Sequence, residues 1–365
     1  MNDRVFNFAA GPGVLPLPVL EQAQRTLISL PGIGVSPLEI SHRTPWFEDV
    51  IEEAEANLRG LLAVPDSHHI VFCQGGATMQ FSMVPMNLLP QGGAAAYVVT
   101  GSWGAKAAKE AEKQGSVRIG WSGTDDGFVR VPSDDEIHDA IRDDTTYLHV
   151  TSNETIQGVE FPITPSVPVP LICDASSDFL SGPTDVARHA VLYAGAQKNA
   201  GPAGVTVAIV RDDMLSGIPD GLPAVLDYRT YVEHHSMYNT PPVFAIYVLM
   251  LVTRWLRDDV GGLDEQLARN REKAGLLYDA IDESDGFYRG HADPGSRSLM
   301  NVTWRLPSPE LERRFIAEAA TSGLTELKGH RSVGGIRASI YNAMPTEGAG
   351  ALAGFMRTFA SSTPA

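Results

Sequence analysis

Residues 171–204, LICDASSDFLSGPTDVARHAVLYAGAQKNAGPAG, are the stretch that decides the fold. They contain two short apolar runs, 171–173 and 191–195, and runs of this length bounded by turn residues predict buried strands. Asp174 follows the first run directly, and Lys198 follows the second after two residues. Ligands of open α/β sheets bind beyond the carboxyl ends of the strands. We therefore expect Asp174 and Lys198 to face a single pocket.

Strands and helices alternate on both sides of this stretch. Further strands are predicted at 69–73, 94–99, 117–120, 147–150 and 205–210. Helices are predicted between them at 79–88, 105–114 and 134–142, and an amphipathic helix precedes them at 46–62. Such alternation is typical of an α/β fold with a largely parallel sheet and helices on both faces.

The two ends of the chain follow other patterns. Residues 1–18 are rich in proline and glycine and are expected to form a loop, and 211–242 look irregular. One long apolar helix is predicted at 243–260 and another helix at 263–281. From Asn301 the order strand, helix, strand, helix indicates a smaller α+β domain. We predict an N-terminal segment 1–18 packing with the small domain, a large domain 19–258 and a small domain 259–365.

Composition limits the classes of function. Hydrophobic residues make up 43% and charged residues 20%, a balance typical of a soluble globular protein. The net charge of −16 argues against nucleic-acid binding, which needs a basic surface. The longest apolar stretch is shorter than the roughly 20 residues of a spanning helix, and no secretory signal is predicted at the N-terminus. Two cysteines, Cys73 and Cys173, fit a reducing cytosol and a cytoplasmic location.

Asp174 and Lys198 admit two interpretations. A buried aspartate is costly unless it is paired, so the two residues could form a structural ion pair. A lysine in a partly desolvated pocket also loses proton affinity and becomes nucleophilic. The second interpretation is therefore a pyridoxal phosphate site, with Lys198 forming the Schiff base and Asp174 keeping the ring nitrogen protonated.

Three loops that follow predicted strands favour the cofactor site. The Gly-Gly pair at 75–76 opens a helix, where free backbone N–H groups and the helix dipole suit a phosphate. Trp103 lies in a Gly-Ser-Trp-Gly loop and could stack on a flat cofactor, although an isolated tryptophan is more often a core residue. The loop 153–155 offers amide and hydroxyl groups, or else a simple turn.

Cationic residues gather in two places that suit anions. His42 and Arg43 lie early in the chain, and His330, Arg331 and Arg337 lie within a late Gly-rich segment. Arginine offers bidentate geometry to carboxylate and phosphate groups. The pairs at 68–69 and 234–235 also contain histidine, but adjacent strand side chains face opposite sides and no H-E-x-x-H motif is present, so no metal site is predicted.

Nine motifs in this order resemble the phosphoserine aminotransferases, a family of fold-type I pyridoxal phosphate enzymes in the class V aminotransferase group. They are FNFAAGPGVLP, SHR, FCQGGATMQF, GSW, SNETIQG, CDASSDF, AQKNAGPAG, YNTPP and GHRSVGGIRASIYNAMP, and they are spread over nearly the whole chain, from residue 6 to residue 345. The resemblance implies a mostly parallel seven-stranded sheet in the large domain. It also implies reversible amino transfer from L-glutamate to 3-phosphohydroxypyruvate, which yields O-phospho-L-serine and 2-oxoglutarate for serine biosynthesis. The phosphohydroxythreonine step of pyridoxine biosynthesis is left open.

The resemblance also implies roles for individual residues. Lys198 would form the Schiff base and serve as the catalytic base, Asp174 would pair with the ring nitrogen, Trp103 would stack on the ring, and Thr155 would bind its hydroxyl. The cofactor phosphate would be held by Ala77, Thr78 and Gln197, joined by Asn239 and Thr240 of the partner subunit of a homodimer. Substrate anions would be bound by His42 and Arg43, also from the partner, together with His330, Arg331 and Arg337.

One position departs from the family pattern. Thr78 stands where some members carry an arginine, so binding of the substrate phosphate would depend more on the His-Arg pairs. Two enzyme alternatives remain, another class V transaminase and a desulfurase, which would need a mobile cysteine. A third alternative is a protein that binds the cofactor or anions without catalysis.

Overall fold

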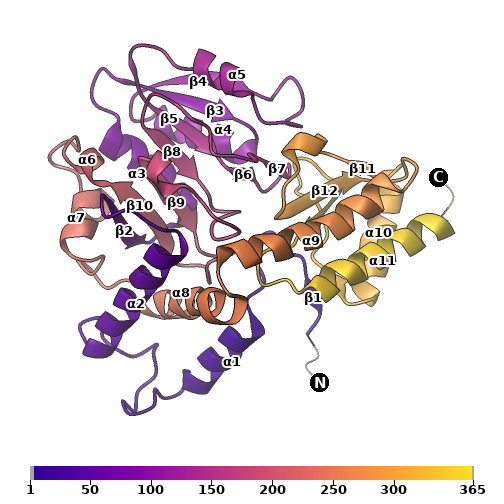
Figure 1. The fold of residues 1–365 in the computed structure, drawn as a ribbon, viewed down its shortest axis with the longest axis horizontal. Coiled ribbons are helices and arrows are strands. Elements are labelled where there is room, and N and C mark those ends of the chain that lie inside the picture. The colour runs from indigo at the N-terminus through magenta and orange to yellow at the C-terminus, as the bar shows by residue number, and fades with distance from the viewer. Residues whose placement is uncertain (1–3, 364–365) are drawn as a thin grey trace.

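A computed structural model describes residues 4–363, and a seven-stranded sheet forms the centre of the larger lobe (Figure 1). The strand order is β2-β10-β9-β8-β5-β3-β4. Their bounds are β2 His68–Cys73, β3 Ala94–Val99, β4 Ser116–Ser122, β5 Thr145–Thr151, β8 Leu171–Asp174, β9 Val191–Gly195 and β10 Thr206–Arg211. Only β10 runs antiparallel to its neighbours, so the predicted mostly parallel seven-stranded sheet is confirmed.

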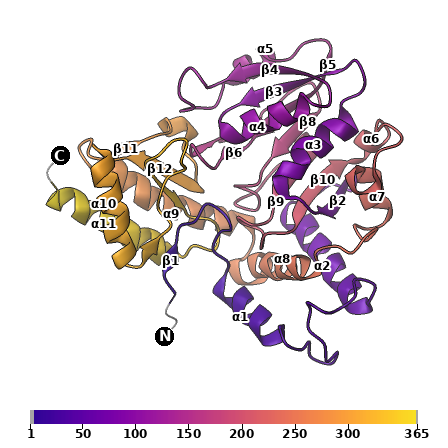
Figure 2. The ribbon, with the colours of Figure 1, turned by 180° about the vertical axis from the view of Figure 1, so that it is seen from behind.

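Helices cover both faces of this sheet (Figure 2). One face packs against α2 (Pro45–Leu61) and α8 (Val243–Trp255), and the other against α3 (Gly76–Leu88) and α4 (Ser102–Ala111). Alternate side chains of β3 enter the two layers, because successive strand residues point to opposite faces. Val98 thus joins the α2 and α8 layer, and Tyr97 joins the α3 and α4 layer.

The smaller lobe has its own sheet and core. Its sheet order is β11-β12-β14, with β11 Arg289–Gly290, β12 Asn301–Arg305 and β14 Ile336–Ser339. Helices α9 (Leu263–Asp282), α10 (Pro309–Thr321) and α11 (Thr346–Ser362) pack on it around Trp304 and Phe315. The boundary predicted at residue 258 falls within a short π-helix, Leu256–Val260, and stays a prediction.

The N-terminal segment lies beside the smaller lobe (Figures 1 and 2). Strand β1 (Phe6–Asn7) pairs in parallel with β13 (Leu324–Thr325), and Phe8 enters the core of the lobe. The first helix, α1, spans Leu17–Thr26, so the prediction of a plain loop over residues 1–18 was wrong at both of these elements. A two-residue strand carries no periodicity, and a helix that begins at Leu17-Pro18 uses proline where its missing N–H costs nothing.

Two further differences concern residues 211–260. The segment expected to be irregular contains α6 (Asp212–Leu215) and α7 (Tyr228–Glu233), both too short for a helical period to stand out. The side chain of Asp227 caps α7 by accepting from the N–H of Arg229 at 2.9 Å. The long helix expected at 243–260 changes to the π-helix after Trp255. Shorter elements in the larger lobe are α5 (Asp134–Asp139), β6 (Asn153–Glu154) and β7 (Val159–Glu160).

Candidate active site

Lys198 lies in the tight turn between β9 and β10, and its side chain is only 8% exposed. Its amine donates to Thr155 Oγ1 at 2.6 Å and to Ser177 Oγ at 3.0 Å. Burial lowers the pKa of Lys198 to about 8, while the nearby carboxylate of Asp174 acts in the opposite direction. The amine is therefore held among hydroxyl groups, and a far larger fraction of it is neutral at physiological pH than of an exposed lysine.

Asp174 ends β8 and is almost completely buried. Its Oδ1 accepts from the backbone N–H of Ser176 at 3.0 Å and from the Ser176 hydroxyl at 2.6 Å. Burial raises the pKa of Asp174, and the hydrogen bonds from Ser176 and the charge of Lys198 oppose this shift. A cation bound beside the carboxylate would stabilise its ionised form further. Asp174 and Lys198 form hydrogen bonds to serine and threonine residues rather than to each other. This disfavours the interpretation of the two residues as a structural ion pair.

These two residues face one cavity of about 250 Å³. Its lining joins the ends of strands β5 and β8 to the first turns of α3 and α4. Seven of the predicted site residues line it: Ala77, Thr78, Trp103, Thr155, Asp174, Gln197 and Lys198. The structure therefore brings together seven of the nine residues predicted to surround the cofactor.

The N-terminus of α3 forms one end of this cavity. Gly75 has a φ of +82°, and a Cβ there would lie 2.5 Å from Met79 Cβ, so only glycine fits the turn. No described side chain caps this helix. Its first N–H groups at Gly76, Ala77 and Thr78 therefore remain available to an anion, which the helix dipole also attracts.

Trp103 forms an aromatic wall of the same cavity. The ring centroid lies 5.8 Å from Lys198 Nζ and 6.4 Å from the centroid of Phe81. The indole Nε1 is buried and has no hydrogen-bond partner among the described residues. A buried donor without a protein partner is free to bond to a water molecule or to a ligand in the cavity.

Cationic side chains gather beside the cavity. Arg337, on β14, donates from Nη1 to the carbonyl oxygen of Thr155 at 3.4 Å, and burial lowers its pKa. The pKa of His330 is also lowered, first by burial and then by the positive charges of Arg337, Lys106 and Arg331. Three positive charges thus lie near His330, as expected for an anion site. Lys106, whose Nζ lies 4.0 Å from the Trp103 ring centroid, was not predicted.

Four predicted site residues lie elsewhere in this chain. His42 and Arg43 precede α2, Asn239 and Thr240 precede α8, and none of them lines the cavity. Asn239 and Thr240 are exposed, and the Thr240 carbonyl accepts from Gln74 Nε2 at 3.3 Å. Their roles stay predictions that require a second subunit.

Sequence reasoning also missed the serines that hold the two central groups. Ser176 binds Asp174, and Ser177 binds Lys198, while both residues lie in the turn that follows β8. The pattern Asp-Ala-Ser-Ser directly after a buried strand was the available signal, because small hydroxyl residues readily bond to neighbouring groups. The turn itself brings each hydroxyl to its partner.

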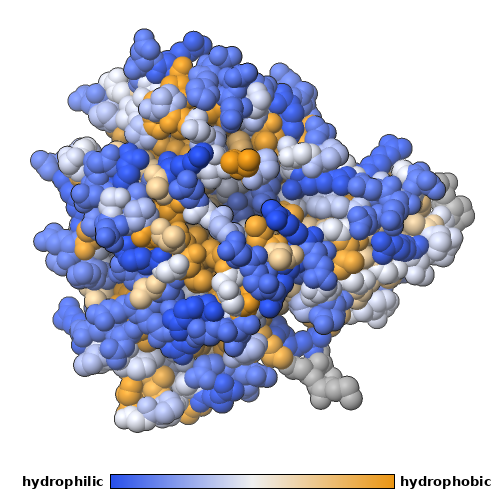
Figure 3. Space-filling view, viewed as in Figure 1, coloured by the Kyte–Doolittle hydropathy of each residue, from blue (hydrophilic) through white to orange (hydrophobic). Residues whose placement is uncertain are grey.

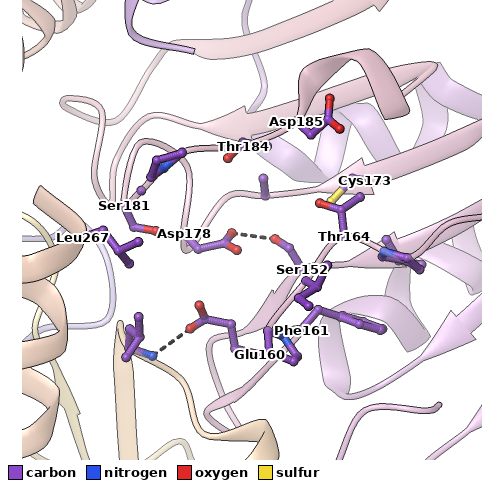
Figure 4. A pocket seen from close by; sticks show the side chains of 18 of the residues that line it. Ser152, Glu160, Phe161, Thr164, Cys173, Asp178, Ser181, Thr184, Asp185 and Leu267 are labelled. Atoms are coloured by element: carbon purple, nitrogen blue, oxygen red, sulfur yellow. Dashed lines mark hydrogen bonds between the residues drawn. The ribbon is translucent and has the colours of Figure 1, made fainter. Parts of the chain in front are cut away.

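A second cavity, of about 550 Å³, is lined by other residues of this turn, among them Asp178 (Figure 4). The side chains of Asp178 and Glu160 point into it, and burial raises the pKa of both carboxyl groups. Ser152 Oγ donates to Asp178 Oδ1 at 2.5 Å and to the Asp174 carbonyl at 3.1 Å. None of the predicted site residues lines this larger cavity.

The histidine pair at 68–69 and the two cysteines take structural roles. His68 Nε2 contacts the carbonyl oxygen of His189 at 3.0 Å, whereas His69 pairs with Asp212 at 2.9 Å. Within residues 4–363, no three histidine, cysteine, aspartate or glutamate side chains gather as metal ligands. Both cysteines are buried, and burial raises the pKa of Cys73 to about 12, so neither is the mobile thiol of a desulfurase.

The donor set around Lys198 fits pyridoxal phosphate. The free amides of α3 suit its phosphate, the Lys198 amine suits its aldehyde, and the Asp174 carboxylate suits its ring nitrogen. Trp103 supplies a flat face for the ring, and Thr155 supplies a hydroxyl.

Comparisons with known proteins agree with this geometry. The family model described as aminotransferase class V matches residues 5–352. A phosphoserine aminotransferase of Rhodopirellula baltica is 54% identical over 98% of this chain and 96% of that protein. The structure of the enzyme of that name from Bacillus circulans subsp. alkalophilus superposes with a TM-score of 0.96, at 49% identity and 99% coverage of both chains. A phosphoserine aminotransferase from Trichomonas vaginalis with bound pyridoxal phosphate gives a TM-score of 0.90, at 38% identity over 97% of this chain and 100% of that one.

Proposed function

The chain belongs to the class V aminotransferase family, and we propose that it transfers an amino group from L-glutamate to 3-phosphohydroxypyruvate with pyridoxal phosphate as cofactor. The observation that carries this function is the buried Lys198 amine, set between the uncapped N-terminus of α3 and the cations around Arg337. The products would be 2-oxoglutarate and O-phospho-L-serine. The names of the relatives support this substrate pair.

Bound pyridoxal phosphate supplies an aldehyde that accepts the amino group and a ring that accepts electron density from the substrate carbon. Asp174 holds positive charge beside the ring nitrogen through its ionised carboxylate. Lys198, in the neutral form that its lowered pKa makes accessible, takes and returns the proton at the substrate Cα. Arg337 binds the substrate α-carboxylate, because a guanidinium matches a carboxylate with two parallel hydrogen bonds.

The substrate phosphate and the glutamate side-chain carboxylate are proposed to share one anion site. His330 and Arg331 would bind both groups, joined by His42 and Arg43 of a second subunit. Lys106 adds a positive charge near His330, which partly compensates for threonine rather than arginine at position 78. The same site would then serve both halves of the reaction.

Spectroscopy of the purified protein tests the function directly. Loaded with pyridoxal phosphate, the protein should show a visible absorption band that bleaches with L-glutamate and returns with 3-phosphohydroxypyruvate. Bleaching by alanine and recovery with glyoxylate, without a response to O-phosphoserine, would instead identify a different class V transaminase. Binding of O-phosphoserine without spectral change or turnover would favour a non-catalytic protein.

We expect uptake of the cofactor to follow the protonation of Lys198. Its neutral amine is the form that attacks an aldehyde, and its pKa is lowered to about 8 by burial. The rate of covalent attachment to the cofactor-free protein should therefore rise about tenfold per pH unit below pH 8 and level off above it. A surface lysine would keep gaining reactivity up to about pH 10. Stopped-flow absorbance measures this profile, and a continued tenfold rise between about pH 9 and 10 would contradict it.

A homodimer with shared active sites is part of the proposal. Exposed apolar side chains gather over the loop between α1 and α2 (Figure 3). They include Ile28 at 83% and Leu38 at 64% exposure, shortly before His42 and Arg43. Exposed hydrophobic patches of this kind mark interfaces. A second copy seated there would carry His42 and Arg43 to the neighbouring site.

Mixing two inactive variants checks this sharing. A dimer of a Lys198→Ala chain and an Arg43→Ala chain should contain one intact site, assembled from the unmodified Lys198 and the unmodified Arg43. Random reassociation of equal amounts should therefore restore about a quarter of the wild-type activity. Activity that stays at the level of the separate variants, although mass spectrometry shows mixed dimers, would contradict shared sites.

The remaining properties are compatible with a cytoplasmic enzyme, the proposed location. Both cysteines are free and buried, as expected in a reducing compartment. No helix within residues 4–363 combines the length and the apolar character needed to cross a membrane.

A further inference from the structure

Glu154 is a completely buried carboxylate that the mechanism above does not use. It belongs to β6, beside the cavity of Lys198, and its side chain is 0% exposed. Burial raises its pKa to about 7, and hydrogen bonds from Gly104 and Trp103 act against this shift. An acid in such a place destabilises the fold unless strong donors surround it.

Both oxygens of Glu154 accept hydrogen bonds from the first turn of α4. Oε2 accepts from the N–H of Trp103 at 2.9 Å, and Oε1 accepts from the N–H of Gly104 at 2.7 Å. These N–H groups have no partner inside the helix, and the positive end of the helix dipole favours a carboxylate there. The residue before the helix, Gly101, has no side chain to cap it. Glu154 thus caps α4 from another element of the fold.

The surrounding residues are shaped for this contact. Gln157 Oε1 accepts from the N–H of Ser102 at 3.3 Å, and Gln157 Nε2 donates to Ser102 Oγ at 2.8 Å. A Cβ at Gly101 would lie 2.6 Å from Glu154 Cδ and 2.7 Å from Gln157 Oε1. Any larger residue at position 101 would therefore push both side chains away from the helix.

The segment that caps α4 also binds the catalytic groups. Thr155, the next residue after Glu154, accepts from Lys198 Nζ and from Arg337 Nη1. Residues 154–155 therefore connect the wall formed by Trp103 to the Lys198 amine and to Arg337, the residue proposed to bind the substrate carboxylate. A shift of the first turn of α4 would move the indole relative to Lys198.

We propose that Glu154 is a positioning residue that holds Trp103 in place for the cofactor ring by capping the first turn of α4. This inference rests on the proposed function, since it assumes that the ring stacks on Trp103. Glu154 itself need not touch the cofactor. Its effect on cofactor binding should pass through the indole.

The test is a double-mutant cycle on cofactor binding to the cofactor-free dimer. Glu154→Gln preserves the shape but leaves one amide N–H facing the backbone donors, so one strong hydrogen bond is lost. We expect the dissociation constant of pyridoxal phosphate to rise about tenfold and the visible circular dichroism of the bound cofactor to fall. In a Trp103→Ala background, the same change should raise the constant less than about twofold, because coupled residues are not additive.

Glu160→Gln is the matched control. Glu160 is a half-buried carboxylate that also accepts from a backbone N–H, that of Leu299 at 2.7 Å, but it faces the second cavity (Figure 4). The Glu160→Gln change should leave the affinity for pyridoxal phosphate unchanged within about twofold. If thermal melting shows that the Glu154→Gln variant is not folded, Glu154→Asp replaces it. The shorter aspartate side chain cannot reach both N–H groups.

The outcomes separate this inference from the proposed function. An equal loss of affinity in the wild-type and Trp103→Ala backgrounds would overturn the inference, because Glu154 would then act independently of the indole. Unchanged affinity and circular dichroism in the folded Glu154 variant, with Trp103→Ala weakened, would overturn it as well. Failure of the wild-type protein to bind pyridoxal phosphate at all would overturn the proposed function itself.

Discussion

Replacing Lys198 by alanine is expected to lower the rate of amino transfer at least about ten-thousand-fold. The change removes both the amine that attaches the cofactor and the base that moves the proton at the substrate Cα. No described neighbour can replace it, because the groups that its amine contacts, Thr155 and Ser177, are hydroxyls. Steady-state assays with L-glutamate and 3-phosphohydroxypyruvate measure the loss, and the visible band of lysine-linked cofactor should disappear.

Lys113→Ala provides the matched control for this change. Lys113 is an exposed lysine that pairs with Glu110 at 2.6 Å on the surface. Its removal should leave the rate unchanged, since exposed ion pairs contribute at most about 1 kcal/mol to stability. A Lys198→Ala protein that retains the band, or more than about one per cent of the activity, would refute the assignment of the base.

Replacing Asp174 by asparagine is expected to lower kcat about a hundred- to a thousandfold. A neutral amide does not stabilise positive charge on a ring nitrogen, so the ring loses most of its ability to accept electron density. The fold should survive, because the amide oxygen can still accept both hydrogen bonds from Ser176. Rapid-mixing spectra with glutamate isolate the chemical step, and KM should change much less than kcat.

Asp178→Asn is the control for the Asp174 variant. Asp178 lies four positions later in the same turn, but its carboxylate points into the second cavity (Figure 4). It influences Lys198 only through its charge, so the expected loss is several-fold at most. If both aspartate variants lost activity equally, general disturbance of the turn would explain the result better than contact with the ring nitrogen.

The sequence was sufficient to predict the central sheet and most of its helices. Short apolar runs bounded by turn residues are local signals, and Leu171–Asp174 and Val191–Gly195, in which every residue is buried, carry them clearly. The short elements α6 and α7 were missed, because four to six residues do not display a period. The π-helix after Trp255 was missed for a similar reason, since its five residues, of which only Leu256 and Val260 are buried, are too few to show a change of period.

The residues of the candidate site also fall into those that the sequence could predict and those that it could not. Asp174 and Lys198 stood out because charged groups at strand ends are unusual, and the ordered motifs assigned their roles through resemblance. Lys106 was missed because a lysine in an amphipathic helix looks like any surface cation. The role of Glu154 was not predicted, because no local pattern shows that a helix 50 residues earlier needs a cap.

By itself, the sequence determined the α/β fold, the chemistry of the Asp174 and Lys198 pair, and the family that its motifs resemble. These properties depend on residue type and short-range order. Only the tertiary structure decided which partners each group has: hydroxyls rather than Asp174 for Lys198, Ser176 for Asp174, and the α4 N–H groups for Glu154. Hydrogen bonds extend over about 3 Å, so they depend on how distant segments pack, and that packing is not encoded in any local stretch.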